Sequence, residues 1–275
     1  MNRNHISEQE VSMLLNDVLE RYGYDFTEYA HASINRRVNH LFQLDRFPSF
    51  AEFRYRIIAD AGYALRFVEE ITVNVTEMFR DPQFYYMLRQ QVLPVLATYP
   101  LIRIWHAGCS TGEEVYSFAI LLKEANLLHK SVIYATDINT SVLEKGRTGI
   151  FPLSQMQQYS RNYMEAGGLH DFSSYYTANY EYAKFRQDLG EKIIFSPHNL
   201  VTDGSFNEFQ LIICRNVLIY FNKTLQDKVL RLFGDSLEPL GFLALGSKES
   251  LNFTSVSGQF RQVDSKEKIW RKHHL

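Results

Sequence analysis

Cysteine and long apolar runs are both scarce in this sequence, and each scarcity excludes a class of protein. Two cysteines among 275 residues, Cys109 and Cys214, are too few for a disulfide framework or a metal-ligand set. No segment approaches the roughly 20 apolar residues of a membrane-spanning helix, and the polar start MNRNHISEQEVS lacks the apolar stretch of a signal peptide. We therefore expect a soluble cytoplasmic protein without a metal and without membrane insertion.

An excess of charge of one sign is also absent. The chain has 29 Lys and Arg residues against 31 Asp and Glu residues, with a net charge of −2. This balance argues against a nucleic-acid-binding protein, which usually relies on a broad basic surface. Hydrophobic residues make up 45% of the chain, enough for a sizeable core, and the length suits one large domain or two unequal ones.

The first part of the chain shows only helical patterns. Ser7 and Glu10 have the spacing of a capping box, and a further helix is predicted in the stretch 29–44, where apolar residues share one face. No strand pattern precedes residue 100. We predict a small all-helical N-terminal domain over residues 1–75.

Short apolar strands alternate with helices after residue 100. Strands are predicted at Leu101–His106, Ser131–Asp137, Lys192–Ser196, Gln210–Cys214 and Phe242–Leu245, and helices at Glu113–Asn126 and Lys223–Ser236. Such alternation predicts a parallel sheet covered on both faces by helices, so we expect a Rossmann-like α/β domain over residues 76–275. The tyrosine-rich stretch of about 150–192 lacks a long amphipathic stripe, and we interpret it as an insertion that could hold short strands.

The segment WHAGCSTGEEVYS, residues 105–117, carries the strongest functional signal. A strand runs into Gly108, a tight turn leads to Gly112, and a helix begins with the acids Glu113 and Glu114. Glycines there let a ligand approach the backbone, but the dinucleotide pattern GxGxxG is absent and two carboxylates would repel a pyrophosphate. S-adenosylmethionine suits this turn, because it has an adenosine end, no phosphate and positive charge. The alternative is a plain glycine turn whose acids only favour the helix dipole.

Polar residues follow several of the predicted strands. Asp137 ends the second strand, where it could bind the ribose hydroxyls of a cofactor or cap the next helix. Asn199 and Asn216 follow later strands, and both could be binding residues or ordinary turn residues. For His198, a local hydrogen bond is a simpler explanation than catalysis. Because ligands of open α/β sheets bind at the carboxyl ends of the strands, these positions predict a cofactor site.

Taken together, these motifs resemble those of the CheR-type chemotaxis receptor glutamate methyltransferases. The resemblance covers nearly the whole chain, in TVNVTEMFRD (72–81), the glycine motif, ATDIN (135–139), HNL (198–200), CRNVLIYF (214–221) and LGSKES (245–250). It implies a class I S-adenosylmethionine-dependent methyltransferase sheet joined to a helical N-terminal domain. The product would be S-adenosylhomocysteine, and the partner would be the cytoplasmic helical region of chemotaxis receptors.

Individual site residues follow from the same resemblance. It implies cofactor contacts from Asn74, Thr76, Arg80, Glu113, Asp137, Asn199, Leu200, Arg215 and Asn216. Tyr220 is expected beside the transferred methyl group, and Arg80 is expected to steer a carboxylate, since a guanidinium binds one with two hydrogen bonds. Arg36 and Arg37 on the N-terminal helix are expected to recognise the receptor, although a merely solvated face would explain them equally well. Met78 and Val115 depart from the common family pattern, which has phenylalanine and proline there, and both exchanges are apolar.

Three other functions compete with this interpretation. A methyltransferase acting on a nucleic acid, a small molecule or another protein is the first, but Arg215-Asn216-Val217-Leu218 lacks the prolines typical of DNA amino-methylating enzymes. A non-catalytic module that binds S-adenosylmethionine is the second. An NAD-linked dehydrogenase ranks last, because the phosphate-binding loop is missing.

Overall fold

The computed structural model describes residues 5–72 and 74–273, and the chain forms two compact units. One unit contains the chain up to residue 72 together with Ile219–Lys228, and the other contains Asn74–Leu218 and the chain from Val229 onward. The grouping of Ile219–Lys228 with the first unit was not predicted from the sequence. Each unit is described by itself below.

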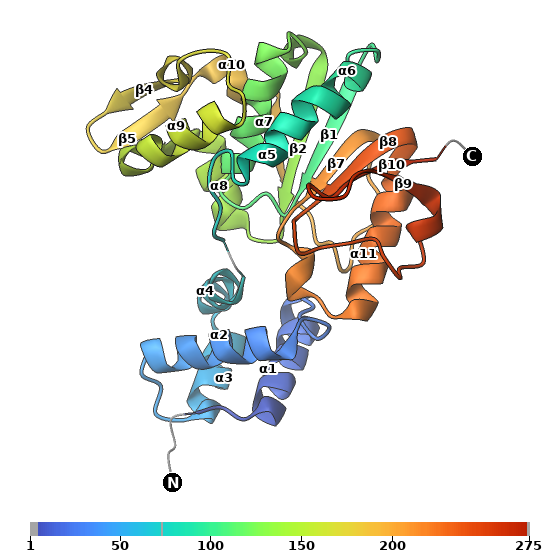
Figure 1. Ribbon diagram of the computed structural model, residues 1–275. Helices are drawn as coiled ribbons and strands as arrows, with labels where there is room; N and C mark the ends of the chain where they lie inside the picture. The colour runs from blue at the N-terminus through green and yellow to red at the C-terminus, as the bar shows by residue number, and fades with distance from the viewer. Residues whose placement is uncertain (1–4, 73, 274–275) are drawn as a thin grey trace. The chain divides into compact units, whose positions relative to one another are not determined.

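The first unit is built from helices. Within residues 5–72 these are α1 (Glu8–Tyr22), α2 (His31–Leu44), α3 (Phe50–Ala59) and α4 (Ala61–Ile71) (Figure 1). Ser7 and Glu10 form the predicted capping box at the start of α1. Phe53 is fully buried among other aromatic rings, including Phe42 and Phe67, so stacked and edge-on rings fill this small core.

The segment Ile219–Lys228 joins this unit through backbone and ring contacts. Tyr29 forms an isolated antiparallel bridge with Phe221, and their ring centroids are 4.9 Å apart. The backbone N–H of Ala30 donates to the carbonyl oxygen of Tyr220 over 2.8 Å. These contacts link residues about 190 positions apart in the sequence.

The second unit is a Rossmann-like α/β domain, as predicted. Its main sheet has seven strands among the described residues: β1 (Ile102–Ala107), β2 (Ser131–Asp137), β6 (Ile193–Pro197), β7 (Phe209–Cys214), β8 (Leu237–Leu245), β9 (Phe260–Asp264) and β10 (Ile269–Lys272). Their order is β6-β2-β1-β7-β8-β10-β9. The first five are parallel to one another, whereas β10 pairs antiparallel with both β8 and β9.

Helices accompany this sheet along the chain. They are α5 (Pro82–Met87), the π-helical turn η1 (Leu88–Val92), α6 (Leu93–Leu96), α7 (Glu113–Glu124) and α8 (Thr140–Thr148), with 3₁₀ turns at Leu128–Lys130 and Ser257–Gln259. Helix α11 (Lys223–Ser236) and the 3₁₀ turn Leu218–Tyr220 are divided between the two units, and Val229–Ser236 of α11 belongs to this one. Buried side chains of β1 and α7, such as Ile104 and Phe118, belong to one large core. No helix of the described ranges 5–72 and 74–273 combines the length and apolarity needed to cross a bilayer.

Strand β1 lies at the point where the strand order reverses. The chain leaves β1 toward β2 and β6 on one side, and then returns to β7 and β8 on the other side. Parallel α/β sheets bind their ligands at such a point, outside the carboxyl ends of the strands. The loops that follow β1, β2 and β7 are therefore the place for a site.

The insertion forms a small subdomain of its own (yellow in Figure 1). Within residues 150–190 it contains β3 (Ile150–Pro152), β4 (Tyr176–Asn179), β5 (Tyr182–Phe185), 3₁₀ turns at Leu153–Gln155 and Phe172–Tyr175, α9 (Met156–Glu165) and α10 (Gln187–Gly190). The three strands pair antiparallel in the order β3-β5-β4. The longest helix of this stretch, α9, has ten residues, so no long amphipathic stripe is present within residues 150–190, although α9 buries Met156, Tyr159 and Tyr163 on one face. Tyrosines form much of that face, so an apolar periodicity based on aliphatic residues misses it.

Candidate active site

The glycine turn that follows β1 is held in a left-handed backbone. Gly108, Ser110 and Gly112 have φ angles of +77°, +50° and +93°, and Gly112 is the residue from which α7 begins. A Cβ atom on Gly108 would lie 2.5 Å from the nearer methyl carbon of Val217, so this position requires glycine for space as well as for conformation. The turn after β1 is thus packed directly against the loop after β7.

Asp137 ends β2 and holds the same turn. One carboxylate oxygen, Oδ2, accepts the backbone N–H of Ser110 over 2.9 Å, and Oδ1 accepts that of Asn139 over 3.0 Å. The N-cap of α8 is Asn139, whose Oδ1 accepts the N–H groups of Ser141 and Val142. The alternative that Asp137 caps this helix is therefore wrong. Burial raises the pKa of the Asp137 carboxyl above its ordinary value, partly offset by its hydrogen bonds to backbone N–H groups.

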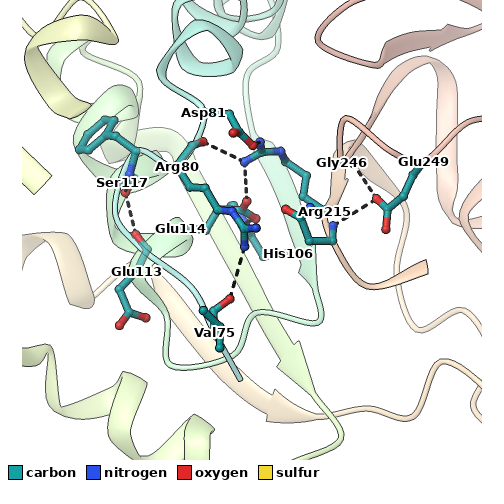
Figure 2. A network of polar contacts seen from close by, with 12 residues as sticks. Val75, Arg80, Asp81, His106, Glu113, Glu114, Ser117, Arg215, Gly246 and Glu249 are labelled. Carbon is teal, nitrogen blue, oxygen red and sulfur yellow. Dashed lines mark hydrogen bonds and ion pairs between the residues drawn. The ribbon is translucent and has the colours of Figure 1, made fainter. Parts of the chain in front are cut away.

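The paired acids at the start of α7 have different surroundings. The Glu114 carboxylate lies between His106, whose Nδ1 is 3.1 Å from Oε1, and Arg215, whose Nη1 donates to Oε2 over 3.1 Å. Burial opposes its ionisation, but the hydrogen bond with His106 and the positive charge of Arg215 outweigh burial, and the pKa of Glu114 is lowered. The Glu113 carboxylate accepts a hydrogen bond from Thr111 and has its pKa raised by burial. Figure 2 shows it pointing away from the Glu114–Arg215 contact.

Arg215, which follows β7, joins the segment after residue 74 to the sheet. Its Nη1 donates to the carbonyl oxygen of Arg80 over 3.2 Å, and its Nη2 forms a 2.6 Å ion pair with Asp81 (Figure 2). The guanidinium also lies 4.0 Å from the centre of the Phe84 ring, a cation–π distance. Only 2% of this side chain is exposed, so three kinds of contact hold one buried cation in place.

Arg80 lies between two residues with left-handed backbone. Phe79 and Asp81 have φ angles of +53° and +58°, a conformation that side-chain-bearing residues adopt at a cost of order 1–3 kcal/mol. The N–H of Phe79 donates to Ser117 Oγ over 3.0 Å, and that hydroxyl donates to the carbonyl of Glu113 over 2.7 Å. The half-buried Arg80 side chain reaches only the carbonyl of Val75, over a long 3.4 Å, in the described part of the chain. Its guanidinium is therefore weakly held while its peptide is fixed.

The remaining predicted residues have local roles as well. Asn216 has a φ angle of +61° and donates its backbone N–H to Glu249 Oε2, which also accepts the N–H of Gly246. Asn199 accepts the N–H of Val201, as in an Asx turn. Nε2 of His198 is 3.1 Å from the carbonyl oxygen of Gly204, in line with the expected local hydrogen bond.

Three further predicted residues are described by their burial. Asn74 and Thr76 are half-buried in the segment that leads to Arg80, and Leu200 is buried after β6. Val73, within the TVNVTEMFRD motif, lies outside the described residues. Tyr220 belongs to the other unit, so its place beside the methyl group stays a prediction.

Sequence reasoning did not identify Asp81, His106 or Glu249. His106 is a fully buried polar residue inside the apolar strand β1, and that break in the apolar pattern was an available signal. Asp81 and Glu249 lie in the quoted motifs TVNVTEMFRD and LGSKES, but their contacts with Arg215 and Asn216 depend on long-range packing that no local pattern shows.

Comparison with known proteins decides the family. The CheR methyltransferase, SAM binding domain, matches residues 74–269, and the CheR methyltransferase, all-alpha domain, matches residues 9–72. This chain belongs to the CheR methyltransferase family. The family and the sheet order together confirm the expected fold class.

Individual relatives agree with this assignment. Cher3 of Pseudomonas putida, named provisionally as a methyltransferase, is 45% identical over 263 residues, which are 96% of each chain. The chemotaxis protein methyltransferase of Salmonella typhimurium is 36% identical over 70% of this chain and 66% of its own length. That of Listeria innocua is 31% identical over 83% and 85%. Among solved structures, the N-methyltransferase NodS of Bradyrhizobium japonicum, in complex with S-adenosyl-L-homocysteine, is 13% identical, with a TM-score of 0.41 over 71% of this chain and 88% of that one.

The residues around the glycine turn fit an adenosyl cofactor. Each oxygen of Asp137 accepts one backbone hydrogen bond and keeps a further lone pair that a ribose hydroxyl could use. The Ser110 hydroxyl is buried and has no hydrogen-bond partner among the described residues, so it can serve a ligand. The carboxylate of Glu113 suits a cationic ligand and disfavours a phosphate.

Proposed function

We propose that this protein transfers a methyl group from S-adenosylmethionine to glutamate side-chain carboxylates on the cytoplasmic helical region of chemotaxis receptors. The products would be glutamyl methyl esters and S-adenosylhomocysteine. Support comes from the family and from relatives named chemotaxis protein methyltransferases. The single observation that carries the proposal is the hydrogen bond from Arg215 to the carbonyl of Arg80, because the same guanidinium also binds Glu114 at the start of α7 and leaves the Arg80 side chain available to a substrate.

Cofactor binding would fall to the loops around β1. Asp137 would accept the ribose hydroxyls, while Glu113 and Ser110 would face the polar parts of the cofactor. Asn74, Thr76, Asn199, Leu200, Arg215 and Asn216 are proposed as further contacts on the family resemblance. Arg215 would act partly through Arg80, since its donors Nη1 and Nη2 already bind the Arg80 carbonyl and two carboxylates.

The proposed methyl transfer does not depend on a general acid or a general base. When bound, S-adenosylmethionine supplies a methyl group on a positively charged sulfur. One oxygen of the glutamate carboxylate would receive that methyl group, and S-adenosylhomocysteine would be the product that leaves. With an ordinary pKa of about 4.3, the glutamate is already ionised near neutral pH and needs no base.

The protein would therefore act by orientation, which can supply up to about 7–11 kcal/mol of a reaction barrier. The weakly held Arg80 guanidinium would bind the incoming carboxylate, and we keep Tyr220 as the proposed hydrogen-bond donor beside the methyl group. Arg36 and Arg37 on α2 are proposed to meet the acidic surface of receptor helices. Arg36 is exposed, whereas Arg37 Nη1 donates to the carbonyls of Glu70 and Thr72 over 3.2 and 3.4 Å. The structure thus favours Arg36 for an external role.

Base lability of the product tests the proposal. The protein is incubated with methyl-labelled S-adenosylmethionine and a purified receptor cytoplasmic fragment, and the fragment is then treated with mild base. Release of the label as methanol is expected of a carboxyl ester. Label that stays on the fragment would indicate N-methylation, and label on nucleic acid would indicate a different substrate class.

A further inference from the structure

Strands β9 and β10 form a basic surface at the edge of the main sheet that the methyl-transfer site does not use. A hollow of about 350 Å³ opens there, lined by Leu240, Arg261, Arg271, Lys272 and His273. We call it the basic hollow. It lies near the start of β8, whereas the site residues Gly246 and Glu249 follow the end of that strand.

The two arginines of the basic hollow lie directly opposite each other. Arg261 of β9 and Arg271 of β10 are partners in the antiparallel pairing, so their side chains leave the same face of the sheet. Like charges at such a position repel each other and destabilise the pairing. No acidic residue lines the hollow, and within residues 74–273 no ion pair joins either arginine or Lys272 to an acid. Glu238, two residues before Leu240, is paired with Arg103 over 2.8 Å.

Two of these cations are already oriented. Arg271 Nε donates to the carbonyl of Leu240 over 3.0 Å, and its guanidinium lies 5.2 Å from the centre of the Phe242 ring. Lys272 Nζ donates to the carbonyls of Gly234 and Leu237 over 2.7 and 2.8 Å. A guanidinium has five N–H donors and an ammonium three, so both groups keep donors for a ligand. Because the two side chains are already held, they lose less conformational entropy when a ligand binds.

We propose that the basic hollow is a binding site for a small phosphate-bearing anion. An anion bound between Arg261 and Arg271 would relieve the repulsion between their charges. It would also accept hydrogen bonds from the N–H groups that the backbone contacts leave unused. Guanidinium groups commonly bind phosphate through paired hydrogen bonds. The volume exceeds what a single phosphate fills and falls at the lower end of small-ligand sites, about 300–1,000 Å³. The ligand class is therefore a diphosphate or a phosphorylated small metabolite.

Calorimetric titration with inorganic pyrophosphate, at constant ionic strength, tests this proposal. Saturable binding is expected, and Arg261→Gln should weaken it at least tenfold. The matched control is Arg161→Gln, which removes one exposed arginine from α9 and should leave the affinity unchanged. Parallel titrations with phosphate and with ribose 5-phosphate show whether the natural ligand is inorganic or a phosphorylated metabolite.

A stability measurement separates a ligand site from a merely structural arginine. Without anion, Arg261→Gln should melt at the same temperature as the wild type or higher, because the repulsion with Arg271 is gone. With saturating pyrophosphate the order should reverse, since the wild type gains more stability from its tighter binding. The proposal is overturned if pyrophosphate does not bind saturably, if Arg161→Gln loses affinity equally, or if the hollow binds only nucleic acid or acidic peptides.

Discussion

The guanidinium of Arg215 donates to the backbone carbonyl of Arg80 over 3.2 Å, across 135 residues of sequence. An arginine expected to contact the cofactor thereby fixes the peptide of the arginine expected to meet the substrate. The same side chain binds Asp81 and Glu114, so one buried cation joins the strained turn to α7. The predictions below follow from this arrangement.

Removal of Arg215 should destabilise the methyltransferase domain strongly. Arg215→Ala leaves the carboxylates of Asp81 and Glu114 without their shared cation, and breaking a buried ion pair in this way typically costs about 3–5 kcal/mol. Urea denaturation measures the free energy of unfolding, with Arg161→Ala as the exposed control. A loss no larger than that of the control would show that the cluster does not depend on Arg215.

Acid should remove the contribution of Glu114 to stability. Its folded pKa is below the ordinary value of 4.5, so the carboxylate stabilises the fold above that value and ceases to do so as pH falls through the folded pKa. The stability difference between the wild type and Glu114→Gln should therefore be largest above about pH 5 and shrink in more acidic solution. The raised pKa values of Glu113 and Asp137 act in both proteins and cancel in this difference. A difference that stays constant with pH would contradict the role given to Glu114.

Cofactor affinity and turnover should respond to different residues. Asp137→Ala should weaken binding of S-adenosylhomocysteine about tenfold or more, because lost hydrogen bonds to a charged group cost roughly 1.5–3 kcal/mol. Arg80→Ala and Tyr220→Phe should instead slow single-turnover methylation at saturating cofactor, since their contacts would matter mainly in the transition state. Binding titration beside single-turnover kinetics checks each variant. Normal turnover of both Arg80→Ala and Tyr220→Phe would refute the assigned reaction centre.

Substitutions of the neighbouring residues Arg36 and Arg37 should have different effects on receptor methylation and on stability. Arg36→Glu should reduce receptor methylation at physiological salt with little change in stability, because its side chain is exposed. Arg37→Ala should lower the free energy of unfolding of the helical unit by about 1–2 kcal/mol, because it removes hydrogen bonds to the carbonyls at the end of α4. Thermal unfolding and a methylation assay separate the two effects. Unchanged methylation by Arg36→Glu would reject the docking role.

Much of the sheet could be predicted because local apolar patterns determine it. The bounds of β2 and α11 agree with the predicted ranges Ser131–Asp137 and Lys223–Ser236. Strands β9 and β10 were missed, because FRQVD is a short, mostly polar strand at the edge of the sheet and IWRK, between β8 and β9, has only two apolar residues. Periodicity shows which residues are buried, but it does not identify strands as short as these.

The sequence indicated which residues belong to the candidate site, but not which residues they contact. Strand ends and the glycine turn indicated Asp137, Glu113 and Asn216, since each follows or precedes a recognisable element, whereas Arg215 was indicated by the family resemblance. Their partners depend on long-range packing that no local pattern encodes: Arg215 with Arg80, and Asn216 with Glu249. The placement of Ile219–Lys228 with the helical unit is of the same kind.

Mapping the methylated residues tests the central claim most directly. A purified cytoplasmic receptor fragment is incubated with the protein and S-adenosylmethionine, digested under mildly acidic conditions that preserve esters, and sequenced by tandem mass spectrometry. We predict the mass of one added methyl group on glutamate side chains, lost when those glutamates are replaced by alanine and reduced at equal reaction times when the protein carries Arg80→Ala. Methylation found on lysine, or none on the fragment while the protein still binds the cofactor, would contradict the account.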